Sequence, residues 1–409
     1  MSSWKNNVNI FLLLLSPILH QYKFIIPGVS IGEFFLFILL LLNIKHLRIE
    51  KKIIITLFPL FLFIFYCLFI SLIHNYYDLN FSYISLIVGL TRYSFYICMM
   101  IIIVNCNILK EDMFIKTYKY IGLIATVYIF IQTIAFYTVG IVLPWKFPFL
   151  TVYAQGYDQI DFSSSFATLY RPYSFFLEPG YYAQYLIPIF VITIFNIKSR
   201  KDKILVSLYT VGFFASTSGQ GIIIGTSVWL IIIGKYFIKN NYGVTIKKVF
   251  LMLMSPLIIL AGTRYIYNNE VINRSILRLF VGDQSSINSR LTSPLTLYHS
   301  LPLYKRIIGI GYNNVEAFFG KIAISNSVIY ILLVSGIIGL ALIALYMILL
   351  YVSVRKNFML KILFFIFFTL LFVTGIFTSL TGMFYQCILL STIGSIQLNK
   401  EKFYEKKQY

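Results

Sequence analysis

The feature that most constrains this chain is its series of long apolar stretches. A helix needs roughly 20 apolar residues to cross the hydrocarbon core of a bilayer, and a window of that length finds about twelve candidates. Inside lipid, only helices and closed barrels pair all their backbone polar groups. The pattern therefore predicts an all-α, polytopic membrane protein in which residues 1–409 form a single integral membrane domain. The predicted spans centre on residues 8–25, 31–44, 53–73, 82–106, 119–142, 181–197, 204–217, 220–238, 249–263, 326–352, 360–379 and 382–396.

Composition excludes several other classes of protein. Charged residues make up 12% of the chain and hydrophobic residues 59%, whereas about a quarter of a soluble domain is charged. A water-soluble enzyme, a disordered chain and a nucleic-acid-binding domain are therefore excluded, and we expect no nucleic-acid partner. The four cysteines all lie in apolar runs and form no CxxC pattern, so neither a disulfide framework nor a zinc site is indicated.

The net charge of +20 is explained by where the basic residues lie. If every predicted span crosses and both termini are cytoplasmic, most of the 34 lysines and arginines fall on the inner side, largely in short loops. Short inner loops are where the positive-inside rule applies, so we expect a multi-pass protein with both termini in the cytoplasm. The inner basic segments are residue 5, 45–52, 110–119, 198–203, 235–248, 355–361 and the tail from 400.

Two connections are long, and this topology places both outside the membrane, at residues 143–180 and 264–325. Long loops in compact domains are commonly functional. At the end of the first loop, Pro172 and Pro179 break regular structure around Arg171 and Glu178, just before an apolar span. A carboxylate near a low-dielectric wall favours a cationic partner, so we expect Glu178 to pair with Arg171; a solvated loop salt bridge is the alternative.

The second long loop carries an excess of arginine that runs against the positive-inside trend. Arg274 and Arg278 are four residues apart and share a face if the segment is helical. The planar arginine fork suits bidentate phosphate binding, which favours an anionic substrate such as a lipid pyrophosphate. Anionic lipid headgroups or simple solvation are the alternatives. The arginines of this loop are Arg264, Arg274, Arg278, Arg290 and Arg306.

Other polar positions leave alternatives open. Arg92 lies inside the predicted span 82–106; it either faces a polar cavity or snorkels or pairs within its helix. His299 is the only histidine of the second long loop and a candidate general base. The polar break 216–221 either lets helices pack closely or lines a sugar cavity. Glycines 309 and 311 lack the further residues of a nucleotide-binding loop, so nucleotide binding is rejected.

Several motifs follow one another along the chain. They are Arg171-Pro172-x-Ser174-Phe175-x-x-Glu178-Pro179-x-x-x-Ala183, the Ser216–Gly221 break, Ser289-Arg290, Gly309-x-Gly311-x-x-Asn314, and Asn326 opening a span that contains Gly336-Ile337-Ile338-Gly339-Leu340. With two large outer loops in an apolar chain of this length, their order resembles the O-antigen polymerase (Wzy-type) family, which is related to the O-antigen ligases.

The resemblance implies a glycosyltransferase at the periplasmic face of the bacterial inner membrane. A growing chain on undecaprenyl pyrophosphate would be transferred to a new lipid-linked repeat unit, and the lipid pyrophosphate would leave. The implied partners are that lipid-linked oligosaccharide and membrane lipid, with a chain-length regulator protein left open; no cofactor or metal is implied. Expected catalytic residues are Glu178, Arg171 and Arg290, and expected substrate-binding residues are Arg92, Arg264, Arg274, Arg278, His299, Asn314 and Asn326.

Two other functions compete with this interpretation. An O-antigen ligase would transfer the glycan to lipid A-core, and His299 in the second outer loop keeps that alternative open. A flippase for the lipid-linked repeat unit would resemble a fold with two similar helical halves and short loops. The chain shows no internal duplication of that kind, which favours the polymerase.

Overall fold

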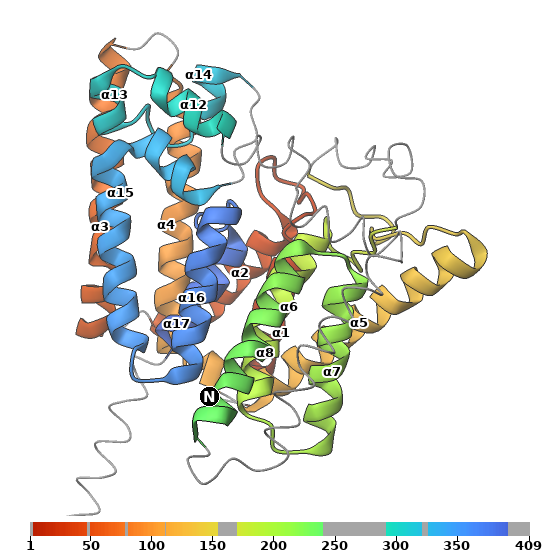
Figure 1. Ribbon diagram of the computed structural model, residues 1–409. Coiled ribbons are helices and arrows are strands. Elements are labelled where there is room, and N and C mark those ends of the chain that lie inside the picture. Colours follow the sequence, from red (N-terminus) through yellow and green to blue (C-terminus); the bar gives the residue numbers. More distant parts are fainter. Residues whose placement is uncertain are drawn as a thin grey trace, which may run out of the picture. The chain divides into compact units, whose positions relative to one another are not determined.

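The computed structural model describes residues 3–46, 50–77, 81–110, 112–153, 170–239, 292–320 and 326–391. Most of these residues are helical, and the described ranges hold no β-strand, only isolated bridges between Tyr22 and Val152 and between Lys23 and Ser30. The helices, labelled in Figure 1, are α1 (Ser3–Leu19), α2 (Ile31–Asn43), η1 (Ile44–His46), α3 (Lys51–Tyr77), α4 (Tyr83–Asn105), η2 (Ile108–Lys110), α5 (Asp112–Val139), α6 (Pro179–Phe195), α7 (Arg200–Ala215), α8 (Gly219–Lys239), α12 (Ser293–Ser300), α13 (Leu303–Ile308), α14 (Val315–Phe319), α15 (Ser327–Val354), α16 (Phe358–Val373) and α17 (Leu380–Leu390).

Each predicted span that begins within the described residues overlaps a helix, although α1 ends at Leu19 and α16 at Val373, six residues before the predicted span ends in each case. The neighbouring spans 204–217 and 220–238 are separate helices, α7 and α8, and the same holds for 360–379 and 382–396, which correspond to α16 and α17. The predicted span 249–263 lies outside the described residues. In the second long loop, the described part forms the short helices α12, α13 and α14.

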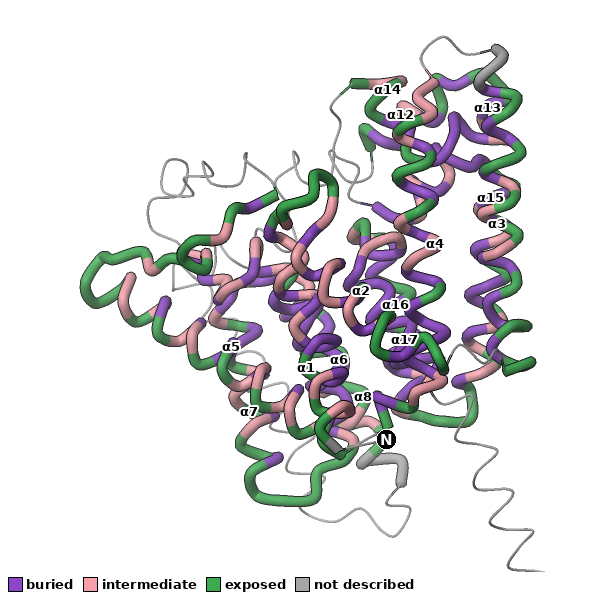
Figure 2. The backbone as a smooth tube through the Cα atoms, turned by 180° about the vertical axis from the view of Figure 1, so that it is seen from behind, coloured by how far each residue is buried: buried purple, intermediate pink, exposed green. Residues whose placement is uncertain are grey.

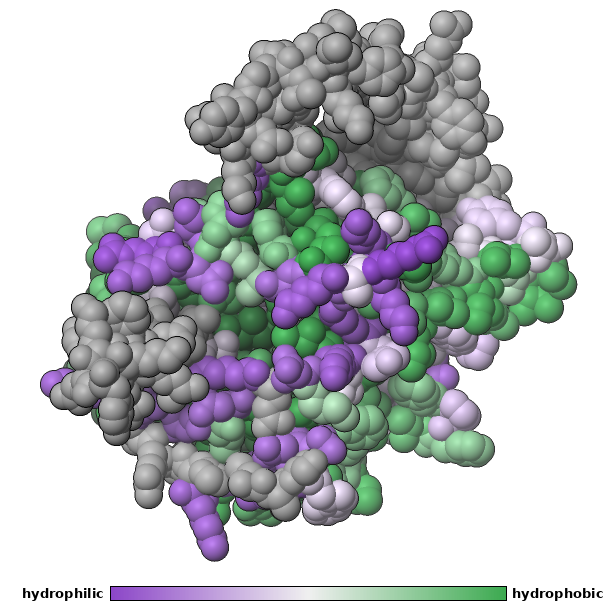
Figure 3. All heavy atoms as spheres, turned by 90° about the horizontal axis from the view of Figure 1, so that it is seen from below, coloured by the Kyte–Doolittle hydropathy of each residue, from purple (hydrophilic) through white to green (hydrophobic). Residues whose placement is uncertain are grey.

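Four of the described helices are long and apolar enough to cross a membrane: α3 over Lys51–His74, α4, α5 and α15. Helices α2, α6, α16 and α17 and the Gly219–Lys235 part of α8 are apolar but shorter. Large apolar side chains are exposed, as Phe65 (68%) and Ile84 (78%) illustrate, and Figure 3 shows such side chains in green beside hydrophilic ones in purple. So much exposed apolar surface suits lipid rather than water, which confirms an all-α, membrane-embedded protein.

The described helices gather into two compact units, whereas the sequence pattern predicts one domain. Unit 1 comprises residues 1–120, 151–153 and 287–409, and unit 2 comprises residues 121–150 and 154–286. Helix α17 is buried along its whole length in unit 1 (Figure 2). In unit 2, α6 is buried over most of its length and packs against α7 and α8.

Unit 1 is organised around a break in α15. Gly336 has φ +64°, which interrupts the helix and frees carbonyls of the preceding turn. The segment after α13 fills the break, because Ile310 N–H donates to Leu333 O (2.9 Å) and Gly311 N–H donates to Val334 O (3.0 Å). The buried irregular backbone is thus paired, as an apolar environment demands.

Helices α3 and α15 run antiparallel in unit 1. Tyr66 donates to the carbonyl of Ser335 (3.1 Å), while Phe63, one turn earlier on α3, lies against Gly339, one turn later on α15. The start of α3 and the end of α15 therefore lie at one end of unit 1. The basic residues at these helix ends, Lys51, Lys52, Arg355 and Lys356, consequently share one end of this unit.

Substitution of Gly336 tests the α15 break. A Cβ at this position would lie 2.1 Å from the Ile307 carbonyl oxygen, and the left-handed φ adds backbone strain. We expect Gly336→Ala to lower stability by about 3 kcal/mol, measured as a fall in the thermal unfolding midpoint of the detergent-purified protein.

Gly234→Ala is the matched control, because a Cβ there meets nothing within 4 Å inside α8 and helix propensity favours alanine. If Gly336→Ala and the unsubstituted protein had the same thermal unfolding midpoint, the proposed requirement for glycine at the α15 break would be refuted.

Candidate functional site

The loop that precedes α6 in unit 2 is held by a buried glutamine. Gln132 of α5 accepts from Ser174 N–H (2.8 Å) and donates to Ser174 O (3.1 Å). Ser174 is buried and has φ +57°, so this clasp fixes a tight turn in the loop. Tyr170 stacks on Phe136 with ring centroids 4.4 Å apart. The backbone around Arg171 is therefore positioned by α5.

Arg171 contacts the break between α7 and α8. Its Nε donates to Oγ1 of Thr217 at 3.3 Å. Thr217 has φ +51°, and its neighbours shape the break: Ser216 donates to Phe213 O, and Ser218 Oγ accepts from Gly221 N–H at the start of α8. The structure thus brings together the Arg171 motif and the Ser216–Gly221 break, which are far apart in the sequence.

Helices α6 and α8 begin side by side at this place. Gln184 of α6 donates to Gln220 of α8 (3.0 Å), and a Cβ on Gly221 would lie 3.1 Å from Cβ of Ala183. The Ser216–Gly221 break therefore does allow close helix packing. It also presents Thr217 and Gln220 as polar groups, so the sugar-cavity interpretation stays a prediction.

Glu178 occupies the N-cap position of α6 without a side-chain capping bond. Its expected ion pair with Arg171 is not formed, and within the described part of the chain Glu178 makes no ion pair. The carboxylate is half-buried at the edge of the helix. We call Arg171, Glu178, Gln184, Thr217 and Gln220 the Arg171 site.

The electrostatics of the Arg171 site favour an anion. The first turn of a helix carries partial positive charge and N–H groups that bind phosphate or carboxylate. Here two such helix starts lie beside a guanidinium. Arginine adds a planar, bidentate donor set, so the arrangement can stabilise negative charge on a phosphate oxygen.

Arg92 lies in unit 1 and is bound to a carboxylate from another helix. Its Nε lies 2.8 Å from Oε1 of Glu33 on α2, and its Nη2 donates to Gly28 O (2.6 Å). Glu33 is buried and also accepts from Tyr96 (2.8 Å) and from Ser30 at the helix N-cap. The carboxylate partner thus lies on another helix, and this network stabilises the α2–α4 contact. Contact of Arg92 with substrate stays a prediction.

The two predicted asparagines are buried in unit 1 and bonded to backbone. Asn314 accepts from Ser82 N–H (2.7 Å), and Asn326 donates to Phe372 O (2.7 Å) while capping α15. Both side chains therefore hold connections between helices, and contact with substrate stays a prediction. His299 is exposed on α12, where its carbonyl accepts from Arg306.

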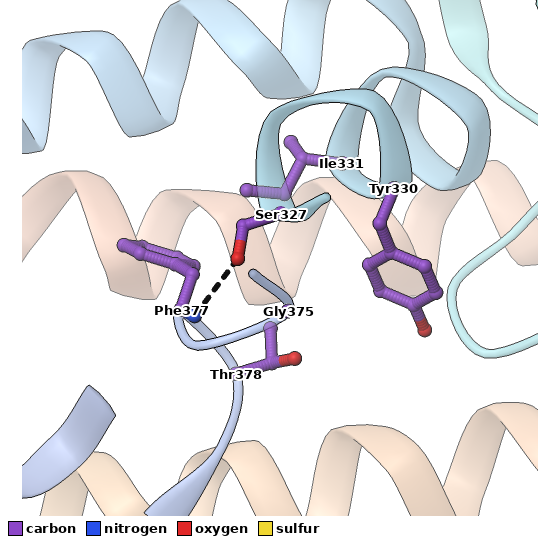
Figure 4. Close-up of a pocket in the computed structure, with 6 residues that line it drawn as sticks. All are labelled: Ser327, Tyr330, Ile331, Gly375, Phe377 and Thr378. Atoms are coloured by element: carbon purple, nitrogen blue, oxygen red, sulfur yellow. Dashed lines mark hydrogen bonds between the residues drawn. The ribbon is translucent and has the colours of Figure 1, made fainter. Parts of the chain in front are cut away.

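A small pocket of about 100 Å³ lies at the start of α15, also in unit 1. Ser327 donates to Thr374 O (2.7 Å) and accepts from Phe377 N–H (3.0 Å); Figure 4 draws the second bond. The volume of this pocket suits a water or a similarly small polar molecule and is too small for a sugar. The lining residues are Ser327, Tyr330, Ile331, Gly375, Phe377 and Thr378.

The remaining predicted residues, Arg264, Arg274, Arg278 and Arg290, lie outside the described residues. The sequence analysis missed Glu33, Gln132, Gln184 and Gln220. Each is polar and lies within or at the start of an otherwise apolar helix, a pattern that signals a bonded or functional group. In the described residues, no group of three or more potential metal-binding side chains occurs.

Comparison with known proteins adds no family to these observations. No protein-family model matches the chain, and no curated protein matches it in sequence.

The Arg92–Glu33 contact predicts a measurable stability coupling. Glu33→Ala leaves the guanidinium and Tyr96 without their carboxylate partner, so we expect a loss of about 1–3 kcal/mol. The double variant Glu33→Ala/Arg92→Ala should lose less than the sum of the two single variants, because they share one interaction. Thermal unfolding of the detergent-purified proteins measures both effects.

The control is Glu316→Ala, which replaces an exposed glutamate on α14. Its thermal unfolding midpoint should equal that of the unsubstituted protein. Strict additivity of the two single variants would show that the network is not an energetic unit.

Proposed function

We propose that this chain is an O-antigen or related polysaccharide polymerase. It joins undecaprenyl-pyrophosphate-linked repeat units at the periplasmic face of the bacterial inner membrane. The order of motifs in the sequence supports the proposal. The structural observation that supports it is the bond from Arg171 to Thr217 beside the starts of α6 and α8, because it unites two of those motifs in a site suited to a phosphate.

The proposed reaction is a glycosyl transfer. The bond between the sugar anomeric carbon and the pyrophosphate oxygen breaks, and a bond from that carbon to an acceptor hydroxyl oxygen forms. Arg171 stabilises the negative charge that develops on the departing lipid pyrophosphate. Glu178, half-buried and at the edge of the same helix start, takes the proton of the acceptor hydroxyl. Arg290, with Arg264, Arg274 and Arg278, is proposed to add further contacts to the anionic lipid.

The Arg171 site predicts a loss of long-chain glycan when its charges change. In a strain lacking the chain, a polymerase defect leaves one repeat unit on the core. We expect the unsubstituted gene to restore the full ladder. Arg171→Ala and Glu178→Gln should each lower polymerisation by about 10²-fold or more. Lipopolysaccharide gels report the ladder, and immunoblots of membranes report the amount of each variant.

Lys146→Gln is the matched control, since it removes a cation of the same connection that lies over Trp145 and is not one of the residues of the Arg171 site. A full ladder from both site variants would refute the catalytic roles proposed for Arg171 and Glu178. A deletion strain without any repeat unit on the core would instead indicate a ligase.

We propose about 12 transmembrane helices with cytoplasmic termini and two periplasmic loops, 143–180 and 264–325. The basic residues at the start of α3 and the end of α15, which share one end of unit 1, support this topology. Alkaline phosphatase folds only outside the cytoplasm, so fusions after residues 147 and 302 should be active and fusions after residues 199 and 356 inactive. Activity of a fusion after 199 together with inactivity after 147 would place the loops on the wrong side.

A further inference from the structure

A second feature of unit 2 is an open groove between α5 and α7. The groove has a volume of about 530 Å³. Phe130 of α5 forms one wall, and Arg200, Lys203, Ile204, Leu208 and Val211 are among the α7 residues that form the other. It shares no residue with the Arg171 site, so it requires a separate explanation.

The α7 side of the groove is charged at one end and mostly apolar along the rest, where it also includes Ser207. Its residues follow a spacing of three and four, so they form one stripe along the helix. Arg200 and Lys203 lie in the first turn, and the apolar side chains extend to Val211, about 16 Å further along the axis. A charged head with an apolar tail of that length matches an amphiphile and does not match a soluble sugar or nucleotide.

The two cations of the groove are available to a ligand. In the described part of the chain, neither Arg200 nor Lys203 makes an ion pair. The nearest acidic side chain in sequence, Asp202, is buried and accepts from Ser199 in a capping box. The apolar stripe is open as well, because Ile204 is 53% exposed and Val211 is 54% exposed.

We propose that this groove binds one anionic phospholipid. Arg200 and Lys203 hold the phosphodiester, and one acyl chain lies against Phe130, Ile204, Leu208 and Val211. The argument is charge complementarity: two adjacent cations at the end of an apolar groove match an anionic headgroup attached to a hydrocarbon chain. Basic pockets between membrane helices bind anionic headgroups in this way, and arginine provides the bidentate contact.

The full-length protein in detergent tests the proposal by native mass spectrometry. Phosphatidylglycerol and phosphatidylcholine with identical acyl chains are titrated separately. We expect one tightly bound phosphatidylglycerol, with an affinity roughly thirtyfold above that for phosphatidylcholine, from two cation contacts. The double variant Arg200→Gln/Lys203→Gln should bind both lipids equally. Lys201→Gln is the matched control, because it is an exposed lysine on the same turn that does not line the groove.

The apolar part of the groove is tested by filling it. Val211→Trp should weaken binding of both lipids about tenfold or more, whereas Phe214→Trp, an exposed α7 residue outside the groove, should leave binding unchanged. Melting curves show whether each variant folds. Because these residues lie outside the Arg171 site, a failure here leaves the proposed polymerase function untouched.

Three results would overturn the proposal. Equal affinities for the two lipids in the unsubstituted protein would exclude an anion-selective groove. Competition by glycerol phosphate as strong as by the intact lipid would indicate a site for soluble anions. A dimer that dissociates only in the double variant would show that the groove is a contact between two copies of the chain.

Discussion

The structure depends on one constraint: irregular backbone in apolar surroundings must find hydrogen-bond partners within the protein. In unit 1 the break at Gly336 exposes carbonyls of α15, and the N–H groups of Ile310 and Gly311 satisfy them. In unit 2 the turn at Ser174 is satisfied by the side chain of Gln132. Both solutions position a polar connection at a fixed place against long helices. The hydrogen bonds that satisfy the irregular backbone in an apolar environment thus also position the polar connections where a functional site can form.

Arg92 and Arg171 show how partners decide what an arginine does. Arg92 meets the buried carboxylate of Glu33, which in turn caps α2 through Ser30, so its guanidinium belongs to a structural network. Arg171 donates to the neutral hydroxyl of Thr217, beside two helix starts that themselves favour anions. Desolvated charge is costly in either place. The first arrangement offsets that cost with an internal anion, and the second adds the partial positive charge of two helix starts beside the guanidinium.

The helices could be predicted from the sequence because their signal is local: an apolar stretch of sufficient length specifies a helix without reference to distant residues. The meeting of Arg171 with Thr217 was not predicted, since it needs the packing of α6 against α8. The expected Arg171–Glu178 pair was wrong for the same reason, because spacing in sequence does not determine which side chains a broken backbone brings together. Glu33 was missed because its partner is far away on α4.

Helix α7 separates the two regions of unit 2 that bind anions under our proposals. Arg200 and Lys203 lie in its first turn, and Thr217 lies two residues after its last residue, Ala215. Its 16 residues extend about 24 Å at the usual rise, a large part of the hydrocarbon thickness of a bilayer. One phosphate cannot contact both regions, so a lipid headgroup held at Arg200 is not the pyrophosphate that leaves at Arg171. Under the proposed topology, the groove lies at the opposite leaflet from the proposed chemistry and binds a lipid other than the substrate.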